Sequence, residues 1–437
     1  MALRPDWLRA VRSTVFNRGA VSSGAASFSK ITEPRCYVRG FRSKTTAMFT
    51  CLLTFTFVLA AFGSGTSGGS PSGAGSHSTL KIGLITEATG DYSSVYLPII
   101  AGTQAAFKQI NAAGGANGHK LSLKVYDSQS TVSGVEAATR QALSDNVFAI
   151  LAASEDLDTV IPLLVSRKVP VIGWGVTPGW YGPGKENLFS FTGDIIDYTF
   201  NSIVTAPLAQ GRKKMAVIAD PTPGDQAAAV VWEKMVKHSG GDLVYTNLDL
   251  DATDIASIDS IAQAAMAKGA QVILSTSCCG AADLQAAINQ LGGNIEVLTS
   301  SEYGQQIQQQ YGKSADGLLA ILFYASLEHT STPGLKVYKA AMKSIGANYL
   351  SAFAPYGYID AEVLAQGLDA IKTKSVTPAN LITAMNHMTT TSLGGLIVPA
   401  TWPKAHTQLI AKWSFSQMQN GKWAPFGPPF PSGEAYP

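Results

Sequence analysis

Short motifs that often mark catalysis occur in this sequence, but each stands in a context that does not suit it. Residues 65–69 (GTSGG) fit the GxSxG pattern of a serine nucleophile, yet no strand precedes them. Residues 86–92 (TEATGDY) have the turn residues of a phosphate loop, but Asp91 would repel a phosphate. Residues 182–185 (GPGK) are too short for a P-loop. The six histidines show no HExxH or paired metal-ligand spacing. The sequence therefore indicates no catalytic residue, no cofactor and no metal.

Length and charge narrow the possible classes of protein. A chain of 437 residues is too long for one ordinary domain and favours two or three compact units. Of its 32 basic and 30 acidic residues, nine basic and two acidic ones lie in residues 1–63. The rest of the chain therefore carries 23 basic and 28 acidic side chains, a net charge of about −5 with neutral histidines. Without a basic stripe, nucleic acid is not expected as a partner.

The N-terminal segment has the pattern of an export signal. Four basic residues between positions 35 and 44 precede the apolar run 47–62, which matches a secretory signal and is short for a membrane span. We assign residues 1–63 to this signal, with an uncleaved membrane anchor as the alternative. Residues 64–79 are rich in Gly and Ser and predict a flexible tether. Phe62 stands where a lipoprotein signal has its cysteine, so the sequence does not support a lipid anchor.

Cysteine usage excludes a disulfide scaffold. Cys36 and Cys51 lie in the export segment, and Cys278 and Cys279 are adjacent. Neighbouring cysteines do not supply the spacing of a zinc site or of a CxxC redox motif. They are interpreted as core or pocket-edge residues, with a strained vicinal disulfide as the alternative.

The elements that must position any site begin with residues 80–115, which predict a strand, a loop and a helix. Ligands of such units bind beyond the carboxyl ends of the strands, so the loop 87–96 is the first candidate site. Further strands and helices alternate along the chain, which predicts α/β architecture with parallel sheets. The expected strands are residues 80–86, 121–127, 147–152, 169–173, 215–219, 243–248, 272–276, 296–299 and 318–323. The expected helices are residues 95–112, 133–145, 156–167, 196–209, 224–238, 254–268, 280–291, 302–311, 334–345, 357–373 and 378–387.

The order of elements is repeated. Residues 80–173 are echoed by residues 215–299, which predicts two similar Rossmann-like lobes with a ligand cleft between them. The tail is different, because residues 408–415 alternate apolar and polar side chains and residues 419–421 form a turn signal. It predicts a terminal hairpin laid against one lobe.

Several stretches resemble one family in the same order. Residues 81–143 (KIGLITEATGDYSSVYLPIIAGTQAAFKQINAAGG followed by ANGHKLSLKVYDSQSTVSGVEAATRQAL) resemble the opening of the periplasmic leucine/isoleucine/valine-binding proteins, solute receptors of ABC importers. The later stretches VPVIGWGVTP, MAVIADPTPGDQAAAVVWEKMVKHSG, VLTSSEYG and AFAPYGYIDAEVLAQGLDAI follow in that family's order. The resemblance covers the chain from about residue 80 onward.

The resemblance implies a type I periplasmic-binding fold, an α/β fold of two Rossmann-like lobes with parallel sheets. The chain would cross between the lobes three times, near Asp194, Tyr324 and Leu393. The first lobe would then comprise residues 80–194 and 324–393, and the second lobe residues 195–323 and 394–437.

For the first lobe, the resemblance and the strand-end rule point to three loops. Tyr96 matches an aromatic that covers the ligand, with Tyr92 close by; a surface aromatic is the alternative. Ala153 and Ser154 precede a helix expected near Asp156, where amide groups and the Ser154 hydroxyl would suit a ligand carboxylate; ordinary helix capping is the alternative. The acids at positions 155, 156 and 158 crowd this helix start and weigh against a carboxylate there.

In the third loop, Trp174 would be a pocket wall or a core residue, and Gly175 would permit close backbone approach. Thr177 matches a threonine that binds the ligand's carboxylate end in the family.

In the second lobe, the resemblance implies that Glu302 pairs with the ligand's amino group, next to Tyr303. The alternative is an acid in the first turn of a helix. Thr222 stands where the family often has a tyrosine, and Cys278 where another ligand-facing residue lies. These departures indicate that the ligand is not simply leucine, isoleucine or valine.

The resemblance implies an exported, extracytoplasmic solute-binding protein of an ABC importer, not an enzyme. As a monomer it would close by a hinge motion around a small polar ligand, such as an amino acid or amide, and deliver it to a membrane permease. One alternative is a ligand sensor of the same fold that controls a protein partner. Another is a secreted α/β hydrolase.

Overall fold

Two separate β-sheets organise the part of the chain that the structure describes. The computed structural model describes residues 78–175, 178–192, 202–277, 279–373, 375–402, 406 and 414–427. The expected export segment and almost all of the tether lie outside these residues, as do Thr177 and Cys278. No helix of the described part is long and apolar enough to cross a membrane.

The first sheet is parallel throughout and has the order β2-β1-β3-β4-β5. Its strands are β1 (Leu80–Thr86), β2 (Leu121–Asp127), β3 (Ala149–Ala153), β4 (Val171–Gly173) and β5 (Leu188–Phe189). Thr86 pairs with Asp127 on one side and Ala153 on the other, so three strands end at the same level. Their carboxyl ends therefore present three loops together.

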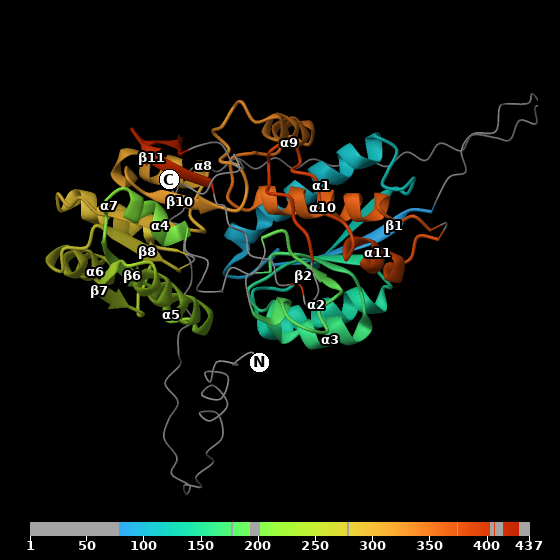
Figure 1. Ribbon diagram of the computed structural model, residues 1–437, viewed down its shortest axis with the longest axis horizontal. Helices are drawn as coiled ribbons and strands as arrows, with labels where there is room; N and C mark the ends of the chain where they lie inside the picture. The colour runs from blue at the N-terminus through green and yellow to red at the C-terminus, as the bar shows by residue number, and fades with distance from the viewer. Residues whose placement is uncertain are drawn as a thin grey trace, which may run out of the picture. The chain divides into compact units, whose positions relative to one another are not determined.

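Helices cover both faces of this sheet, as Figure 1 shows. Successive side chains of β1 point to opposite faces: Leu84 packs in the cluster under α1, whereas Ile85 packs in the cluster under α2. The first face is covered by α1 (Ser93–Ala112), α9 (Pro333–Ser344), α10 (Ala354–Asp369) and α11 (Pro378–Met385). The second face is covered by α2 (Val132–Ser144) and α3 (Ile161–Arg167).

Glycines allow α1 and α10 to touch backbone to backbone. A Cβ atom on Gly102 would lie 1.9 Å from the carbonyl oxygen of Ala354, and one on Gly357 would lie 2.1 Å from that of Ile99. Thr103 Oγ1 bridges the same contact, donating to the Gly357 carbonyl at 3.2 Å. This close packing ties a helix from late in the chain to the first lobe.

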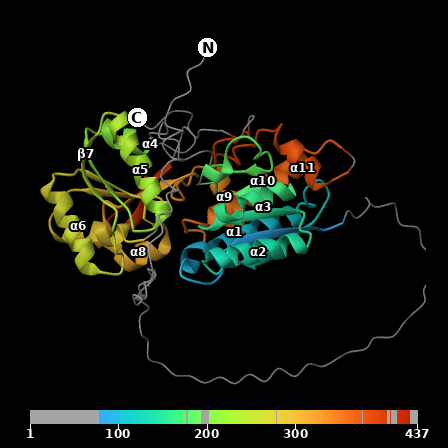
Figure 2. The ribbon, with the colours of Figure 1, turned by 90° about the horizontal axis from the view of Figure 1, so that it is seen from below.

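The second sheet has the order β12-β11-β10-β9-β8-β6-β7. Strands β6 to β10 pair in parallel, whereas β11 pairs antiparallel with both β10 and β12. Its strands are β6 (Lys214–Ile218), β7 (Asp242–Asn247), β8 (Val272–Ser275), β9 (Glu296–Thr299), β10 (Leu319–Leu322), β11 (Ser414–Gln419) and β12 (Lys422–Phe426). The helices after β5 and before α9 are α4 (Ser202–Ala209), α5 (Pro223–His238), α6 (Ile255–Ala267), α7 (Ala281–Gln290) and α8 (Gln305–Tyr311). Helices α5 and α6 pack beside β7, as Figure 2 shows.

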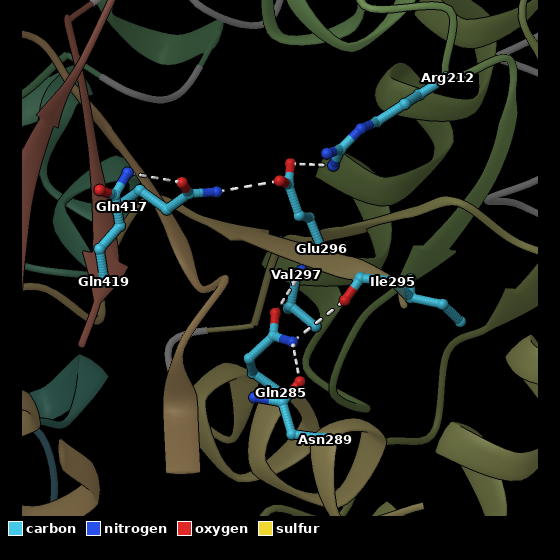
Figure 3. Close-up of polar contacts among 8 residues, drawn as sticks. All are labelled: Arg212, Gln285, Asn289, Ile295, Glu296, Val297, Gln417 and Gln419. Atoms are coloured by element: carbon cyan, nitrogen blue, oxygen red, sulfur yellow. Dashed lines mark hydrogen bonds and ion pairs between the residues drawn. The ribbon is translucent and has the colours of Figure 1, made fainter. Parts of the chain in front are cut away.

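The C-terminal hairpin is fastened to the parallel part of this sheet by polar side chains (Figure 3). Glu296 forms an ion pair with Arg212 and accepts a hydrogen bond from Gln417 Nε2 at 2.9 Å. Gln285, 1% exposed, spans the same end of β9: it donates to the Ile295 carbonyl at 3.0 Å and accepts from the Val297 amide at 2.8 Å. The start of β9 is thereby tied to α7, to β11 and to the residue Arg212 before β6.

Between β10 and α9 the chain passes from the second sheet to the helices over the first sheet. The passage expected near Asp194 lies outside the described residues. Beyond Leu393, where another passage is expected, two side chains contact the end of the first sheet. Trp402 Nε1 donates to the Ser190 carbonyl at 3.0 Å, and His406 Nδ1 lies 2.7 Å from the Leu188 carbonyl.

The predicted fold class is confirmed, and three strands have the predicted bounds: Leu80–Thr86, Leu121–Asp127 and Glu296–Thr299. Two details were wrong. The two-residue strand β5 was not predicted. The helix expected over residues 156–167 is a 3₁₀ turn, Leu157–Thr159, followed by α3. In the described part of the chain the first hairpin strand is Ser414–Gln419, which pairs with β10 through residues 414–417; residues 408–413 lie outside that part.

Candidate functional site

The loops after β1 and β3 meet around a buried carboxylate. Glu87 directly follows β1 and is 0% exposed. Its Oε1 accepts hydrogen bonds from the Ser154 hydroxyl at 3.1 Å and the Glu155 amide at 2.9 Å. Burial raises the pKa of Glu87 to about 7, and the Glu155 and Asp156 charges add to this rise. The donors that follow β3 are therefore used by the chain's own carboxylate.

This arrangement differs from the sequence expectation for Ala153 and Ser154. Ala153 is the last residue of β3 and is buried in the sheet beside Thr86. No regular α-helix begins at Asp156, so the expected row of amide groups is replaced by a short 3₁₀ turn. The acids at positions 155, 156 and 158, which weigh against a ligand carboxylate here, lie in this 3₁₀ turn or directly before it.

Tyr96 lies in the first turns of α1 and reaches the loop after β3. Its hydroxyl donates to Glu155 Oε1 at 2.5 Å, while its ring is 1% exposed. Glu155 itself is exposed. Tyr92, half-buried just before α1, donates its amide to Ser130 Oγ at 3.1 Å. Tyr96 thus fixes the Glu155 carboxylate at the surface of the strand-end region.

Four rings form what we call the aromatic cluster: Tyr96, Trp174, Phe353 and Tyr356. The Trp174 ring centroid lies 5.2 Å from that of Phe353 and 5.3 Å from that of Tyr356. Trp174 is half-buried, and its Nε1 has no hydrogen-bond partner within the described part of the chain. The cluster joins the end of β4 to the start of α10, because the α1–α10 contact brings Phe353 there.

Gly175 follows Trp174 and approaches its own chain closely. A Cβ atom there would lie 2.7 Å from Ser190 Cβ. Its amide donates to Ser190 Oγ at 3.1 Å, and its carbonyl accepts from the Tyr181 hydroxyl. The glycine is required by this internal packing.

The loop after β6 carries two neighbouring acids. Thr222 caps α5, accepting from the Asp225 amide at 3.2 Å, and its hydroxyl oxygen lies 2.7 Å from Asp225 Oδ2 and 3.0 Å from Asp220 Oδ1. Burial raises the pKa of Asp225, the adjacent Asp220 carboxyl raises it further, and Glu155 adds a smaller repulsion. The two acids belong to different lobes: Glu155 follows β3 of the first sheet, and Asp225 lies in the first turn of α5 beside the second.

Glu302, expected to pair with a ligand amino group, contacts the start of α7. Its Oε2 accepts from the Ala282 amide at 2.7 Å and its Oε1 from the Gly280 amide at 3.2 Å. Burial raises the pKa of Glu302 to about 7, against the lowering effect of these amides. The neighbouring Cys279 is half-buried.

Tyr303 is 5% exposed and turns toward the passage between the sheets. Its hydroxyl lies 2.9 Å from both carboxylate oxygens of Glu328, and its ring centroid lies 4.9 Å from that of Trp423. Ser326 and Ser416 also donate to Glu328, at 2.7 and 2.9 Å. Tyr303 therefore holds β9, the passage and the terminal hairpin together.

The sequence singled out Tyr96, Trp174, Thr222 and Glu302, which all lie at strand ends, but it missed their partners. Glu87, Asp225, Phe353 and Tyr356 were not predicted as site residues. A sequence signal for the two acids was available: Glu87 directly follows an expected strand, and Asp225 lies at the start of an expected helix. Among the described residues, no group of three or more His, Cys, Asp or Glu side chains is placed to hold a metal ion.

Comparisons with known proteins agree with this architecture. Residues 79–422 match the family model described as periplasmic binding protein. An extracellular ligand-binding receptor from Verminephrobacter eiseniae is 20% identical with a TM-score of 0.70, covering 79% of this chain and 99% of the other. No curated protein matches the chain.

Two further solved structures have bound ligands in their descriptions. A branched chain amino acid ABC transporter protein from Thermus thermophilus with bound valine is 18% identical, with a TM-score of 0.69, 82% of this chain covered and 98% of the other. A solute binding protein of an ABC transporter from Rhodopseudomonas palustris, in complex with p-hydroxybenzoic acid, is 19% identical, with a TM-score of 0.67, 82% of this chain covered and 98% of the other. These likenesses concern the fold. Because the family model spans most of its length, the chain belongs to the periplasmic binding protein family.

Proposed function

We propose that this protein is the solute-binding component of an ABC importer and binds a small polar ligand between the strand ends of its two sheets. The observation that carries the proposal is the pair of sheets whose strand-end loops bear the aromatic cluster in the first lobe and Thr222 and Glu302 in the second. Ligands of such folds bind at the strand ends, in a cleft that takes contacts from both lobes. The family match supports the same role.

The ligand-contacting set in this proposal starts from the strand ends. Tyr96, Trp174, Thr222 and Glu302 are its described members, joined by Glu155 and Asp225. Tyr92, Ala153, Ser154, Gly175, Thr177, Cys278 and Tyr303 complete the set expected from the sequence. Thr177 and Cys278 keep their place because in sequence they follow the last residues of β4 and β8 by four and three positions.

Closure would be a hinge motion about the passages between the lobes. The first lobe would comprise residues 80–194 and 324 to about 406, and the second lobe residues 195–323 and the terminal hairpin. The hydrogen bonds of Trp402 and His406 to the first sheet support the later boundary. A ligand favours the closed state only by the difference between its affinities for the closed and open forms. Contacts from both lobes supply that difference.

Location and partners follow from this role. Residues 1–63 would direct export, residues 64–79 would act as a tether, and the folded part would work outside the cytoplasm as a monomer. Its partners would be the ligand and an ABC permease in the membrane.

Thermal unfolding and small-angle scattering of the purified protein test the proposal. A panel of amino acids, amides, amines and organic acids is screened first. A true ligand at 100 times its Kd stabilises the folded state by about 2.7 kcal/mol and reduces the radius of gyration as the lobes close. If no compound and no ligand recovered by native mass spectrometry does either, the proposal is wrong. Closure without transport by a reconstituted permease would instead favour the sensor alternative.

A further inference from the structure

The segments that follow the parallel strands carry acids and no fixed positive charge. In sequence, residues 86–95, 127–131, 153–161, 174–181, 219–226, 276–284 and 300–305 contain no Lys or Arg. They contain ten carboxylates: Glu87, Asp91, Asp127, Glu155, Asp156, Asp158, Asp220, Asp225, Asp283 and Glu302. A ligand carboxylate bound at the strand ends would therefore meet like charges, and these segments offer it no cationic partner.

Two sets of neutral groups suited to an anion are also occupied. Backbone amides at loop and helix starts are the usual partners of a ligand carboxylate. Here the Ser154 hydroxyl and the Glu155 amide donate to Glu87, and amides at the start of α7 donate to Glu302. In each lobe a carboxylate of the chain takes the place that a ligand carboxylate would need.

The groups that remain suit a cation. The Tyr96 hydroxyl holds the exposed Glu155 carboxylate next to the aromatic cluster. Trp174, the half-buried member of that cluster, places its ring beside Tyr96, with the two ring centroids 6.0 Å apart. An ammonium group gains from the face of Trp or Tyr and from a nearby carboxylate at once.

Repulsion between the lobes points the same way. Glu155 from the first sheet and Asp225 from the second interact unfavourably. A positive charge placed between them turns this repulsion into attraction and favours closure. A metal ion is a poorer occupant, because the described residues offer no cluster of three ligands.

We propose, building on the solute-binding function above, that the ligand is an organic amine without a free carboxylate, whose ammonium group binds between Glu155 and Asp225 against Trp174. The relatives with valine and p-hydroxybenzoic acid bind carboxylic acids. The ligand proposed for this chain differs from theirs, because the acids at the strand ends of this chain would repel a carboxylate.

Calorimetric titration with matched compounds tests this assignment. Leucine carries both charges, 3-methylbutylamine lacks the carboxylate, and 4-methylpentanoate lacks the amine; phenylalanine, phenethylamine and 3-phenylpropionate form a second set. We expect each amine to bind at least tenfold more tightly than the acid and the amino acid of its set. Amine binding should also release protons near pH 7, seen as a dependence of the heat on the buffer, because a cation lowers the pKa of nearby carboxyls.

Two variants locate the charge. Glu155→Gln should weaken amine binding at least tenfold, and Asp225→Asn should weaken it similarly. Glu136→Gln removes the same charge from the exposed ion pair with Arg140 on α2 and should change nothing. Circular dichroism checks that each variant is folded.

The outcomes separate this inference from the function beneath it. Tight binding of the acids or amino acids with weak binding of the amines overturns the inference and leaves the solute-binding role intact. Amine binding that is insensitive to both Glu155→Gln and Asp225→Asn also overturns it. Absence of binding and closure with every compound of the wider panel overturns both.

Discussion

The Ser154 hydroxyl donates a hydrogen bond to Glu87 Oε1 at 3.1 Å and thereby joins the ends of β3 and β1. Glu87 is fully buried, and its second oxygen, Oε2, has no partner within the described residues. A buried carboxylate that is only half satisfied disfavours its charged form, so the pKa of Glu87 rises to about 7. The same pair removes from the strand end the donors that an anionic ligand would use.

Replacing Glu87 by Gln should flatten the pH dependence of stability. The folded protein holds this proton up to pH about 7, whereas an unperturbed glutamate loses it near 4.5. Folding therefore takes up a proton between these values, and the wild-type free energy of unfolding falls as the pH rises through that window. Glu87→Gln lacks the titration, so its stability relative to wild type should improve by roughly 1–3 kcal/mol from pH 5 to pH 8.

Urea unfolding of both proteins at pH 5 and pH 8 measures this difference. Glu136→Gln, which removes an exposed carboxylate from α2, is the control and should keep the wild-type pH dependence. Equal pH slopes for wild type and Glu87→Gln would show that Glu87 is ionised throughout this range.

Gly102→Ala should disrupt the packing of α1 on α10. The new methyl group would lie 1.9 Å from the Ala354 carbonyl oxygen, far inside van der Waals contact. Because both partners are backbone, the helices must separate, and we expect a loss of about 3 kcal/mol or failure to fold. Ser94→Ala, at an exposed position of the same helix, is the control. Wild-type stability of Gly102→Ala in denaturant unfolding would refute the close contact.

The fold was predictable where local pattern and tertiary structure agree. The strand Leu80–Thr86 is buried on both faces, so its apolar run is a direct signature of its position. The strand Leu188–Phe189 was not predictable, because two residues carry no periodicity. The end of the first hairpin strand was not predictable, because its register depends on pairing with β10, which is distant in sequence.

The candidate site was predictable only in part, for a related reason. The rule that ligands bind at strand ends selects the loops that follow strands, and Ser154 and Glu302 lie in such loops, after β3 and β9. It does not find which groups satisfy each other: the bond from Ser154 to Glu87 spans 67 residues. Phe353 joins the aromatic cluster only because two glycine-containing helices approach closely. Such partners depend on the assembled fold.

The ion pair of Arg212 with Glu296 should be stronger than a surface pair. The two side chains are 31% and 15% exposed, and Glu296 also accepts from Gln417. A double-mutant cycle with Arg212→Gln and Glu296→Gln should give a coupling energy of roughly 1–2 kcal/mol, because partial burial reduces screening. The exposed pair of Arg140 and Glu136 should give about 0.3–0.5 kcal/mol. Similar couplings for the two pairs would contradict the role given to Glu296.

Tyr303→Phe should weaken the passage between the two sheets. The Tyr303 hydroxyl donates to Glu328 at 2.9 Å and accepts from the buried Leu327 amide at 3.1 Å. The variant leaves that amide without its acceptor, which should cost about 1–3 kcal/mol and speed hydrogen exchange at Leu327. Tyr349→Phe, at a residue 38% exposed, is the control in urea unfolding and exchange. Unchanged exchange at Leu327 would mean that another group accepts its amide, and that the hinge does not depend on Tyr303.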